Sequence, residues 1–381
     1  MPRELSRSSC CRRQSAQRAY VVKLLNYIFY QAIRDRASDI HLEPFEHDFK
    51  IRYRVDGSLF ELEAPPPHLA EALIARIKVM SDLDIAETRL PQDGRIELTV
   101  GGRSVDLRVS TLPTMFGEST VMRILDRSNV ALSLDNLGLV HEVRDKLRAF
   151  AALPHGIVLV TGPTGSGKTT TLYAVLNEAN REDTKVITVE DPVEYDLEGI
   201  IQVPVNEDVG VSYSKVLRTI LRQDPDVILV GEIRDQETAQ TAIEASLTGH
   251  LVFSTLHTND AASAITRLID IGIEPFLLTS TIQGIMAQRL VRRVCDDCKT
   301  FYEPADDILR RLHLTADQAV GSKFAYGKGC STCNFTGYRG RMAITEVLEV
   351  DDRMVELVSE GFDVAIRIGD LPDSSLKARN V

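Results

Sequence analysis

The sequence predicts an α/β protein in which a parallel β-sheet covered by helices is preceded by a smaller α+β unit. Three observations carry this prediction. Short β-branched runs alternate with helical stretches beyond residue 150, a glycine-rich loop follows the first of these runs, and two hairpin patterns lie upstream. Nearly continuous apolar strands separated by helices are typical of a parallel sheet that is buried on both faces.

The length and composition are those of a globular protein with more than one domain. Its 381 residues exceed a typical single domain, and 44% hydrophobic with 26% charged residues is an ordinary balance. No apolar run approaches the roughly 18 residues of a membrane span, and no apolar segment follows the basic N-terminus as in a secretory signal. We therefore expect a cytoplasmic protein. The formal net charge of −11 argues against a general nucleic-acid binder, so no nucleic-acid partner is expected.

The first part of the chain predicts a small lobe. Residues 1–17 are polar, basic and rich in serine, and we expect a disordered leader there. An α+β lobe is expected over 18–126, beginning with a helix in which apolar residues recur at helical spacing from Val21. The rest of the lobe is expected to contain two hairpins with turns at Asp56-Gly57 and Gly101-Gly102, and a helix over 68–81 between them.

A change of pattern marks the larger domain. Residues 127–137 break every strong period and are predicted to be a linker, and the parallel-sheet domain is expected over 138–294. Ligands of such sheets bind beyond the carboxyl ends of the strands, and a polar cluster follows each predicted strand. The predicted strands are 157–160, 186–189, 227–230 and 251–254. A cysteine-containing subdomain over 295–340 and a C-terminal segment over 341–381 complete the division.

The polar cluster after the first strand is a complete phosphate-loop motif, G-x-x-x-x-G-K-[ST]. Its glycines let backbone N–H groups curl around a β-phosphate, and the following helix adds the positive end of its dipole. Lys168 is expected to reach the β- and γ-phosphates and Thr169 to ligate Mg²⁺. The motif therefore predicts a nucleoside triphosphate, ATP, with Mg²⁺. The predicted binding residues are Gly162, Pro163, Thr164, Gly165, Ser166, Gly167, Lys168, Thr169 and Thr170.

Carboxylates follow the second and third strands. Glu190, Asp191 and Glu194 are candidates to hold a metal-bound water or to act as general base, and a merely solvated turn is the alternative. Glu232 ends the third strand in the Walker B arrangement, which holds Mg²⁺ through water or polarises the attacking water. Gly231 stands where many nucleotide hydrolases carry an aspartate, so a helix-capping glutamate stays open as the alternative.

Two histidines border the fourth strand. His257 lies just past its end among polar residues, where a side chain that senses a γ-phosphate is expected. A satisfied structural histidine is the alternative at this position. His250 precedes the strand, and functional and structural roles are equally open for it.

Four of the six cysteines form two C-x-x-C pairs, Cys295 with Cys298 and Cys330 with Cys333. Four thiolates in this arrangement suit tetrahedral Zn²⁺ with no open position for catalysis, which predicts a structural zinc site. Two disulfides are the alternative, and a cytosolic location disfavours them. Basic residues flank both pairs and indicate either a solvated face or a surface for anionic lipid. They are Arg292, Arg293, Lys299, Lys328, Arg339 and Arg341.

In this order the motifs resemble the secretion ATPase superfamily. The nearest match is the type II secretion ATPases (general secretory pathway protein E), with the type IV pilus assembly ATPases next. The resemblance covers residues 20–350. The matching segments are 162–173, 187–195, 222–226, 231–235 and 248–259 with the paired cysteine motif, and 37–44, 54–57 and 91–95 upstream.

The resemblance implies a RecA-like ATPase core behind a PAS-like N-terminal lobe. It implies a homohexameric ring with ATP bound between the lobes. In such a ring Glu194 and Glu232 would position or activate water, and His257 would sense the γ-phosphate. Lobe rotation could then gate hydrolysis through inserted arginines. The residues at the positions of the family's nucleotide-contacting arginines are Arg95, Arg108 and Arg123.

The resemblance also implies a motor whose ATP hydrolysis powers pseudopilus assembly and protein export. It would work peripherally on the cytoplasmic face of the inner membrane, with inner-membrane secretion assembly proteins as partners. Family members carry an N-terminal domain that docks on such a partner, whereas only a short polar leader precedes Tyr20. Residues beyond Gly361 do not match the family's helical tail. We therefore expect no docking domain and a truncated or divergent C-terminal segment.

Four other functions compete with this interpretation. A type IV pilus assembly ATPase is the nearest. A pilus retraction motor is less favoured because those relatives generally lack the cysteine pairs. A nucleic-acid motor shares the phosphate loop, but the acidic balance of this chain argues against it. A nucleotide-binding scaffold that no longer hydrolyses ATP is the alternative from a different functional class.

Overall fold

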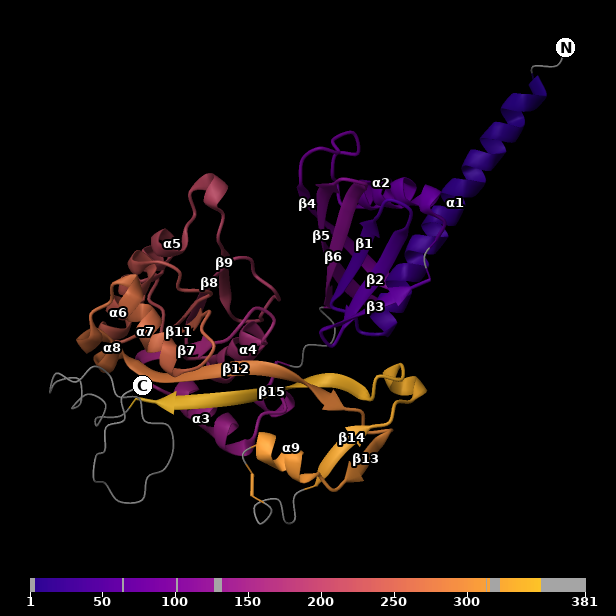
Figure 1. Ribbon diagram of the computed structural model, residues 1–381. Coiled ribbons are helices and arrows are strands. Elements are labelled where there is room, and N and C mark those ends of the chain that lie inside the picture. Colours follow the sequence, from indigo (N-terminus) through magenta and orange to yellow (C-terminus); the bar gives the residue numbers. More distant parts are fainter. Residues whose placement is uncertain are drawn as a thin grey trace. The chain divides into compact units, whose positions relative to one another are not determined.

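The structure of the protein is a computed structural model (Figure 1). It describes residues 4–63, 65–100, 102–126, 132–312, 314–315 and 323–350. Gly101 of one predicted turn, 127–131 of the predicted linker and 351–381 of the predicted C-terminal segment lie outside the described residues. The chain divides into two compact units: Met1–Ala131 with Arg292–Gly340, and Leu132–Val291 with Arg341–Val381.

The first unit contains a six-stranded antiparallel sheet packed against two helices. Its strand order is β3-β2-β1-β6-β5-β4. The core lies between the helices and the sheet, where Leu25, Phe29 and Leu73 are buried in one cluster with Ile40 and Leu107. In chain order the elements are α1 (Glu4–Arg34), β1 (Asp39–Pro44), β2 (Phe49–Val55), β3 (Ser58–Leu62), η1 (Pro67–Leu69), α2 (Ala70–Met80), β4 (Gln92–Val100), β5 (Arg103–Thr114) and β6 (Gly117–Asp126).

Both predicted hairpins of this unit are present, as β2–β3 and β4–β5. Asp56 and Gly57 turn the first with φ of 49° and 85°, and two successive positive φ values suit the twist of the flanking strands. α1 begins at Glu4, so a helix runs through most of the segment 1–17 for which the sequence predicts a disordered leader. Once the turns from Val21 onward are packed, extending a helix is far easier than starting one.

The second unit contains a seven-stranded sheet in the order β15-β12-β7-β11-β10-β8-β9. In chain order its elements are η2 (Leu134–Asn136), α3 (His141–Ala151), β7 (Gly156–Thr161), α4 (Lys168–Ala179), β8 (Val186–Glu190), β9 (Ile201–Pro204), η3 (Glu207–Val209), α5 (Tyr213–Ile220), β10 (Val227–Val230), α6 (Gln236–Leu247), β11 (Leu251–Leu256), α7 (Ala262–Ile271), α8 (Pro275–Thr281), β12 (Ile282–Val294) and β15 (Tyr338–Glu349). The unit boundary falls within β12 and β15.

The larger sheet is buried on both faces, as the sequence predicts. β7, β8, β10 and β11 coincide with the four predicted strands and pair in parallel. Ile157 and Leu159 of β7 pack with α5, α6, α7 and α8, whereas Val158 and Val160 pack with α3 and α4 (Figure 1). Successive residues of a strand point to opposite faces, so one continuous apolar run serves both helix layers. The predicted α/β class with a parallel sheet is therefore confirmed.

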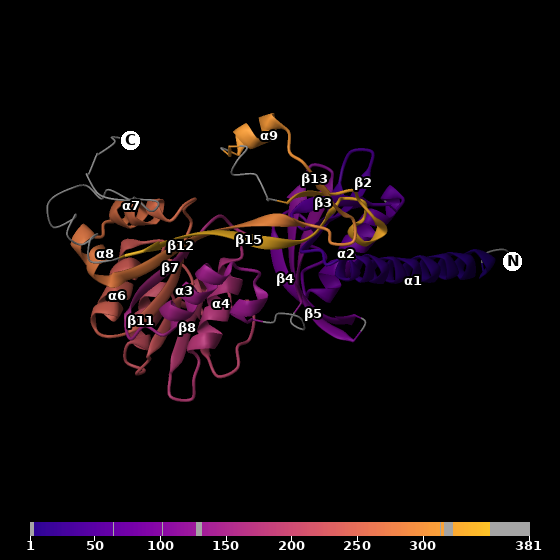
Figure 2. The ribbon, with the colours of Figure 1, turned by 90° about the horizontal axis from the view of Figure 1, so that it is seen from below.

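β12 is a further parallel strand that the sequence analysis did not predict. Ala287 of β12 stands opposite Thr161, the last residue of β7, so the rest of β12 continues past the carboxyl end of β7. β12 and β15 run side by side as a long ribbon (Figure 2). The phosphate loop follows β7 directly, so β12 reaches the place where that loop lies.

The cysteine-containing residues belong to the first unit. Cys295 and Cys298 precede β13 (Lys299–Tyr302), which pairs with β14 (Phe324–Gly327), and α9 (Asp306–Arg311) lies between these strands in the chain. The second pair lies around η4 (Ser331–Cys333). A Cβ on Gly327 would lie 1.9 Å from the carbonyl oxygen of Gly337, so the two backbone segments touch only because both residues are glycine.

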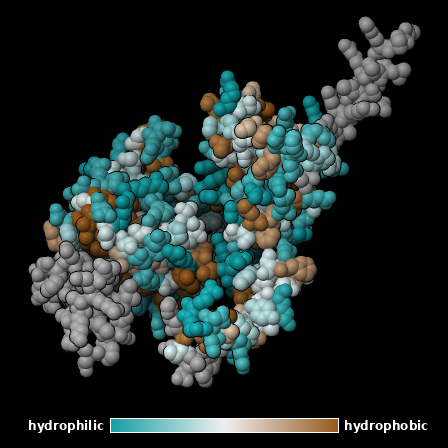
Figure 3. All heavy atoms as spheres, in the orientation of Figure 1, coloured by the Kyte–Doolittle hydropathy of each residue, from teal (hydrophilic) through white to brown (hydrophobic). Residues whose placement is uncertain are grey.

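Hydrophilic residues cover most of the visible face of each unit, and apolar residues form small groups among them (Figure 3). Within the described residues, no helix has the length and apolar character that crossing a membrane demands.

Candidate functional site

The phosphate loop joins β7 to α4 at the carboxyl edge of the large sheet. Gly162, Gly165 and Gly167 have φ of 146°, 76° and 87°, which side-chain-bearing residues rarely adopt. A Cβ on Gly162 would lie 2.3 Å from the carbonyl oxygen of Gln288, and one on Gly167 would lie 2.8 Å from its Nε2. Thr169 follows in the first turn of α4 with an exposed side chain. The glycines thus serve both the turn and the close approach to β12.

Polar groups of this loop fit a phosphate ligand. Lys168 is 9% exposed, and its Nζ donates to the carbonyl oxygens of Gly162 (2.9 Å) and Pro163 (3.2 Å). Burial lowers the pKa of Lys168, and the negative charge of Glu232 opposes that shift. Among the described residues, the buried Ser166 hydroxyl has no hydrogen-bond partner. A buried ammonium group and an unpartnered hydroxyl both gain from an anionic acceptor, so the loop fits a nucleotide phosphate.

Glu232 and His257 come together at the same edge of the sheet. They follow β10 and β11, which are neighbours, and His257 Nε2 lies 3.3 Å from Glu232 Oε1. Arg234 donates from Nε to the other carboxylate oxygen of Glu232 at 2.8 Å. The helix-capping alternative for Glu232 is wrong, because Asp235 caps α6 by accepting a hydrogen bond from the Thr238 N–H at 2.8 Å. Strand order has therefore brought two predicted site residues into contact.

The glycine at position 231 has a packing reason. A Cβ there would lie 3.0 Å from the hydroxyl oxygen of Tyr213 and 3.1 Å from the carbonyl oxygen of Val189. The end of β10 is crowded by β8 and α5, so an aspartate side chain would meet both. The acidic group of this motif accordingly stands one residue later, at Glu232.

The acidic segment after β8 separates into buried and accessible carboxylates. Glu190 is 4% exposed and accepts hydrogen bonds from Tyr173 Oη, from Thr188 Oγ1 at 2.5 Å and from Gln202 Nε2 at 3.2 Å. Burial, together with the Glu190 charge, raises the pKa of Tyr173. The backbone N–H of Glu194 donates to the same Tyr173 oxygen at 3.2 Å, and the Glu194 side chain is half-buried. Glu190 is committed to the protein interior, which leaves the exposed Asp191 and the half-buried Glu194 as candidates for water.

His250 has structural contacts at the opposite edge of the sheet. Its Nδ1 lies 2.8 Å from the carbonyl oxygen of Ala245 and 3.1 Å from Thr248 Oγ1, both at the end of α6. It precedes β11, whereas the phosphate loop follows the carboxyl end of neighbouring β7. Of the two roles that the sequence leaves open, these contacts favour the structural one.

The arginines of the first unit form a row across its sheet. Arg95 stands opposite Arg108, Arg108 opposite Arg123, and Arg123 opposite Asp39. Residues directly opposite each other share a face, and the next residues on these strands, such as Ile96, are buried on the other face. Arg123 forms an ion pair with Asp39, with its Nε 3.2 Å from Oδ1. The row therefore lies on the face turned away from the core of this unit.

The four cysteine sulfurs form a compact cluster. Those of Cys295 and Cys330 are 3.9 Å apart, those of Cys298 and Cys333 3.8 Å, and those of Cys330 and Cys333 3.7 Å. Sulfurs bound to one tetrahedral Zn²⁺ at about 2.3 Å lie about 3.8 Å apart, whereas a disulfide requires about 2.0 Å. The arrangement thus fits a four-thiolate metal site, and the disulfide alternative is wrong because all four cysteines are free.

Backbone donors favour a thiolate at Cys333, whereas desolvation raises the pKa of Cys298 to about 12. Desolvation raises the pKa of Cys333, but the N–H groups of Cys330 (3.2 Å) and Gly337 (3.3 Å) donate to its sulfur, and the net result is a lowered pKa. Thiolates are the form of cysteine that binds metal.

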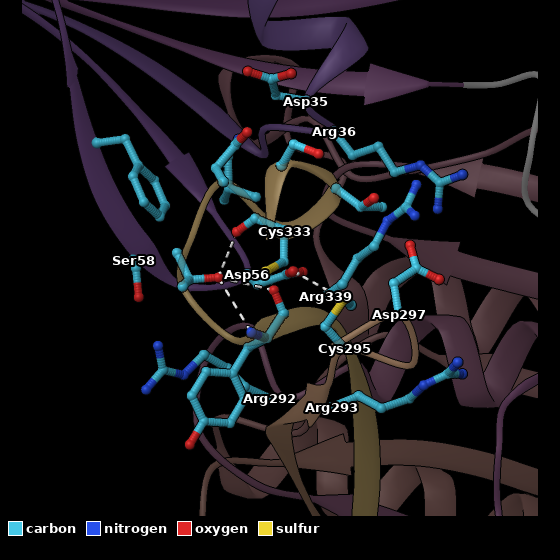
Figure 4. Close-up of a pocket in the computed structure, with 18 of the residues that line it drawn as sticks. Asp35, Arg36, Asp56, Ser58, Arg292, Arg293, Cys295, Asp297, Cys333 and Arg339 are labelled. Atoms are coloured by element: carbon cyan, nitrogen blue, oxygen red, sulfur yellow. Dashed lines mark hydrogen bonds between the residues drawn. The ribbon is translucent and has the colours of Figure 1, made fainter. Parts of the chain in front are cut away.

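A cavity of about 660 Å³ lies beside the cysteine cluster within the first unit (Figure 4). The Gly340 N–H donates to Asp56 Oδ2 at 2.7 Å, and the Arg292 guanidinium lies 4.3 Å from the ring centre of Tyr338. Arginines and aspartates both line the cavity. The carboxylates therefore reduce the net positive charge of the basic residues that the sequence associates with anionic lipid. The charged lining residues are Arg34, Asp35, Arg36, Asp56, Arg292, Arg293, Asp296, Asp297 and Arg339.

Two side chains that support the phosphate site, those of Gln288 and Tyr173, were not predicted from the sequence. Gln288 donates from Nε2 to the carbonyl oxygen of Ser166, and Tyr173 bonds to both Glu190 and the Glu194 N–H. A single sequence offers one weak signal for Gln288, a polar residue within an apolar run.

Comparison with known proteins identifies the family. The family model for Type II/IV secretion system proteins matches residues 14–368. The type II secretion system ATPase E of Vibrio cholerae is 53% identical over 345 residues, which are 91% of this chain and 68% of that protein. The type II secretion system protein E of Dickeya dadantii is 51% identical over 355 residues, 92% of this chain and 70% of that protein.

A solved structure is similar along most of the chain as well. The crystal structure of the pilus retraction motor PilT with bound ADP has a TM-score of 0.58 and 28% sequence identity, covering 88% of this chain and 85% of that chain. Sequence and fold therefore agree, and this chain belongs to the family of Type II/IV secretion system proteins.

Proposed function

We propose that this chain is a Mg²⁺-dependent ATPase whose hydrolysis powers pseudopilus assembly and protein export in type II secretion. One observation carries the enzymatic part: Lys168 of the phosphate loop and the Glu232–His257 pair follow the carboxyl ends of the adjacent strands β7, β10 and β11, at one edge of the sheet. Similarity to type II secretion system proteins supports the export part.

Each residue of the site has a role in this proposal. Lys168 would leave its two carbonyl partners for the β- and γ-phosphates, and Thr169 would contribute its exposed hydroxyl to Mg²⁺. The metal ion would neutralise charge that develops on the transferred phosphoryl group. Glu194 and Glu232 would orient or polarise the attacking water, and His257 would report the γ-phosphate to Glu232.

We further propose a homohexamer in which the arginine row completes the nucleotide site. A surface row of arginines turned away from its own core suits a phosphate ligand held by a second domain. The domain division that goes with this proposal is a lobe over 18–126, a linker over 127–137, an ATPase domain over 138–294 and a zinc subdomain over 295–340. A C-terminal segment over 341–381 follows, which the family model matches as far as residue 368.

The proposed metal of the cysteine cluster is a structural Zn²⁺. Four thiolate ligands at tetrahedral spacing leave no position for water or substrate, and soft sulfur ligands suit zinc. Cys295, Cys298, Cys330 and Cys333 would hold the ion and fix the two loops that carry them.

The proposed location is the cytoplasmic face of the inner membrane, with secretion assembly proteins as partners and no nucleic acid. Exposed Arg292 and Lys299 beside the cysteine cluster would be the contact for anionic lipid, since Arg293 is already paired with Asp296. A type IV pilus assembly ATPase is the second candidate function, since the chain is also similar in fold to a solved pilus motor, PilT.

The first experiment is the ATPase rate per subunit with Mg²⁺, measured against protein concentration in zinc-replete samples that are also sized. We expect the rate per subunit to rise with concentration as hexamers form, because arginines of one subunit complete the site of the next. A flat rate from monomers contradicts the shared site. No hydrolysis at any concentration, with retained ADP binding, would favour the non-hydrolysing scaffold instead.

A further inference from the structure

The side chain of Gln288 lies directly against the phosphate loop. It is 3% exposed, its Nε2 donates to the carbonyl oxygen of Ser166 at 2.8 Å, and its Oε1 accepts from Thr171 Oγ1 at 2.8 Å. One side-chain amide on β12 thus bonds both to the loop and to α4, the helix that follows the loop. Neither partner is near Gln288 in the sequence.

The amide can take only one orientation. A carbonyl oxygen only accepts hydrogen bonds, so Ser166 requires the NH₂ group of Gln288, and Oε1 is left for the Thr171 hydroxyl. Thr171 is 2% exposed, so water cannot replace either bond at low cost. Each of the three groups therefore holds the other two in place.

The loop is shaped around this side chain and its backbone. At Gly167 a Cβ would collide with Gln288 Nε2, and at Gly162 a Cβ would collide with the Gln288 carbonyl oxygen. Both positions therefore require glycine. The peptide groups between Ser166 and Lys168 are among those whose N–H groups cradle a phosphate in a loop of this type. Their orientation depends on the Ser166 carbonyl, which Gln288 fixes.

We propose that Gln288 is a positioning residue for nucleotide binding, acting through Ser166 and Thr171 rather than by touching the nucleotide. The inference rests on the proposed function only in requiring that the loop binds a nucleotide. It needs no hydrolysis. β12 becomes, on this view, a part of the nucleotide site, although its strand residues lie over 100 positions from the loop in sequence.

The test compares one substitution at two places on the same strand. Gln288→Met keeps the length of the side chain and removes both hydrogen bonds. Gln283→Met makes the same change near the start of β12, where its Cγ lies against Gly156 at the opposite edge of the sheet. Binding of ADP with Mg²⁺ to the full zinc-replete chain is measured by calorimetry, together with stoichiometry and urea unfolding.

We expect Gln288→Met to weaken ADP binding about tenfold or more relative to Gln283→Met, since two buried hydrogen bonds that shape the loop are lost. The stoichiometry should stay unchanged. A purely structural role would lower the unfolding midpoint while the folded fraction binds ADP as the control does, and that result overturns the proposal.

Thr171→Val provides a second variant in case Gln288→Met does not fold. It preserves volume and removes only the hydroxyl that fixes the amide, so ADP binding should weaken severalfold. Where both variants fold, their double mutant should bind no worse than Gln288→Met alone, because both act through one linkage. If the losses in ADP binding of the two single variants added fully in the double mutant, that result would contradict a shared linkage. An unmodified chain that binds ADP but does not hydrolyse ATP refutes the proposed function alone, whereas one that binds no ADP refutes both.

Discussion

His257 and Glu232 lie in contact across the ends of two neighbouring strands, with Nε2 3.3 Å from Oε1. Glu232 is only 16% exposed as a side chain and is also held by Arg234, whereas His257 is 44% exposed. The glutamate is therefore the fixed member of the pair and the histidine the member that can turn toward a ligand. Under the proposed function, both would face the γ-phosphate of a nucleotide held by the loop.

Glu232→Gln should abolish turnover while nucleotide binding is retained. The amide keeps the shape of the side chain but cannot polarise water, and loss of a general base costs about 10²-fold or more in rate. ATP hydrolysis and ADP binding are measured on the same samples. Glu237→Gln is the matched control, because Glu237 is exposed on α6 and paired with Arg218. Equal rates for both variants would contradict the role of Glu232.

ADP binding should weaken as the pH rises into the alkaline range. The loss should begin at a lower pH than the one at which an ordinary lysine loses its proton. Burial lowers the pKa of Lys168, so its ammonium group loses its proton earlier, and the phosphates lose their cationic partner as pH rises. The charge of Glu232 raises that pKa, so Glu232→Gln should move the loss of binding to lower pH. ADP titrations at a series of pH values test this, and a shift in the opposite direction would refute it.

Tyr173→Phe should destabilise the second unit by about 1–3 kcal/mol, because the buried Glu190 carboxylate loses one of its donors. The Glu194 N–H loses its acceptor in the same step. Urea unfolding measures the effect. Tyr20→Phe, at a residue 51% exposed, is the control and should leave stability unchanged. A stability equal to that of the control would show that Glu190 finds another donor.

Arg95→Ala and Arg108→Ala should each lower kcat about 10³-fold if these arginines stabilise transition-state charge, with a much smaller change in ATP affinity. Arg76→Ala, an exposed arginine on α2 on the helix-covered side of the sheet, is the control. Steady-state kinetics separate kcat from KM. Equal losses in kcat and affinity would instead indicate ground-state binding.

Cys295→Ser and Cys330→Ser should each reduce bound zinc and lower the thermal unfolding midpoint together, because metal binding and folding of the two loops are coupled. Metal content is measured by atomic absorption on purified protein. Cys11→Ser, outside the C-x-x-C pairs, is the matched control and should retain the metal. Unchanged zinc content in both cluster variants would falsify the structural zinc site.

The sequence could predict the features that depend on local geometry. Glycines at three positions of one loop need backbone conformations that other residues avoid, so the motif itself specifies the turn between β7 and α4. The four strands 157–160, 186–189, 227–230 and 251–254 were recognisable because continuous apolar runs must be covered on both faces. The Asp56-Gly57 hairpin followed from its two-residue turn.

Other features could not be predicted because they depend on contacts between distant residues. The contact of the buried Glu190 carboxylate and of the Glu194 N–H with one oxygen depends on where α4 places the Tyr173 hydroxyl. The C-x-x-C spacing predicts pairs of ligands, but backbone hydrogen bonds between distant residues bring the two pairs together: the Cys295 N–H donates to the Gly337 carbonyl oxygen at 2.9 Å, and the Lys328 N–H to that of Cys298 at 3.1 Å. A periodicity in one segment does not say which other segment will lie beside it.

The sequence by itself determined the ligand chemistry: a phosphate loop with Lys168, carboxylates after the strands and four thiolates. Only the tertiary structure decided which of these groups meet. Strand order set His257 against Glu232, and the overhang of β12 set Gln288 against Ser166. The physical reason is that a loop's conformation follows from the torsional freedom of its own residues, whereas a contact across the sheet follows from the packing of the whole domain.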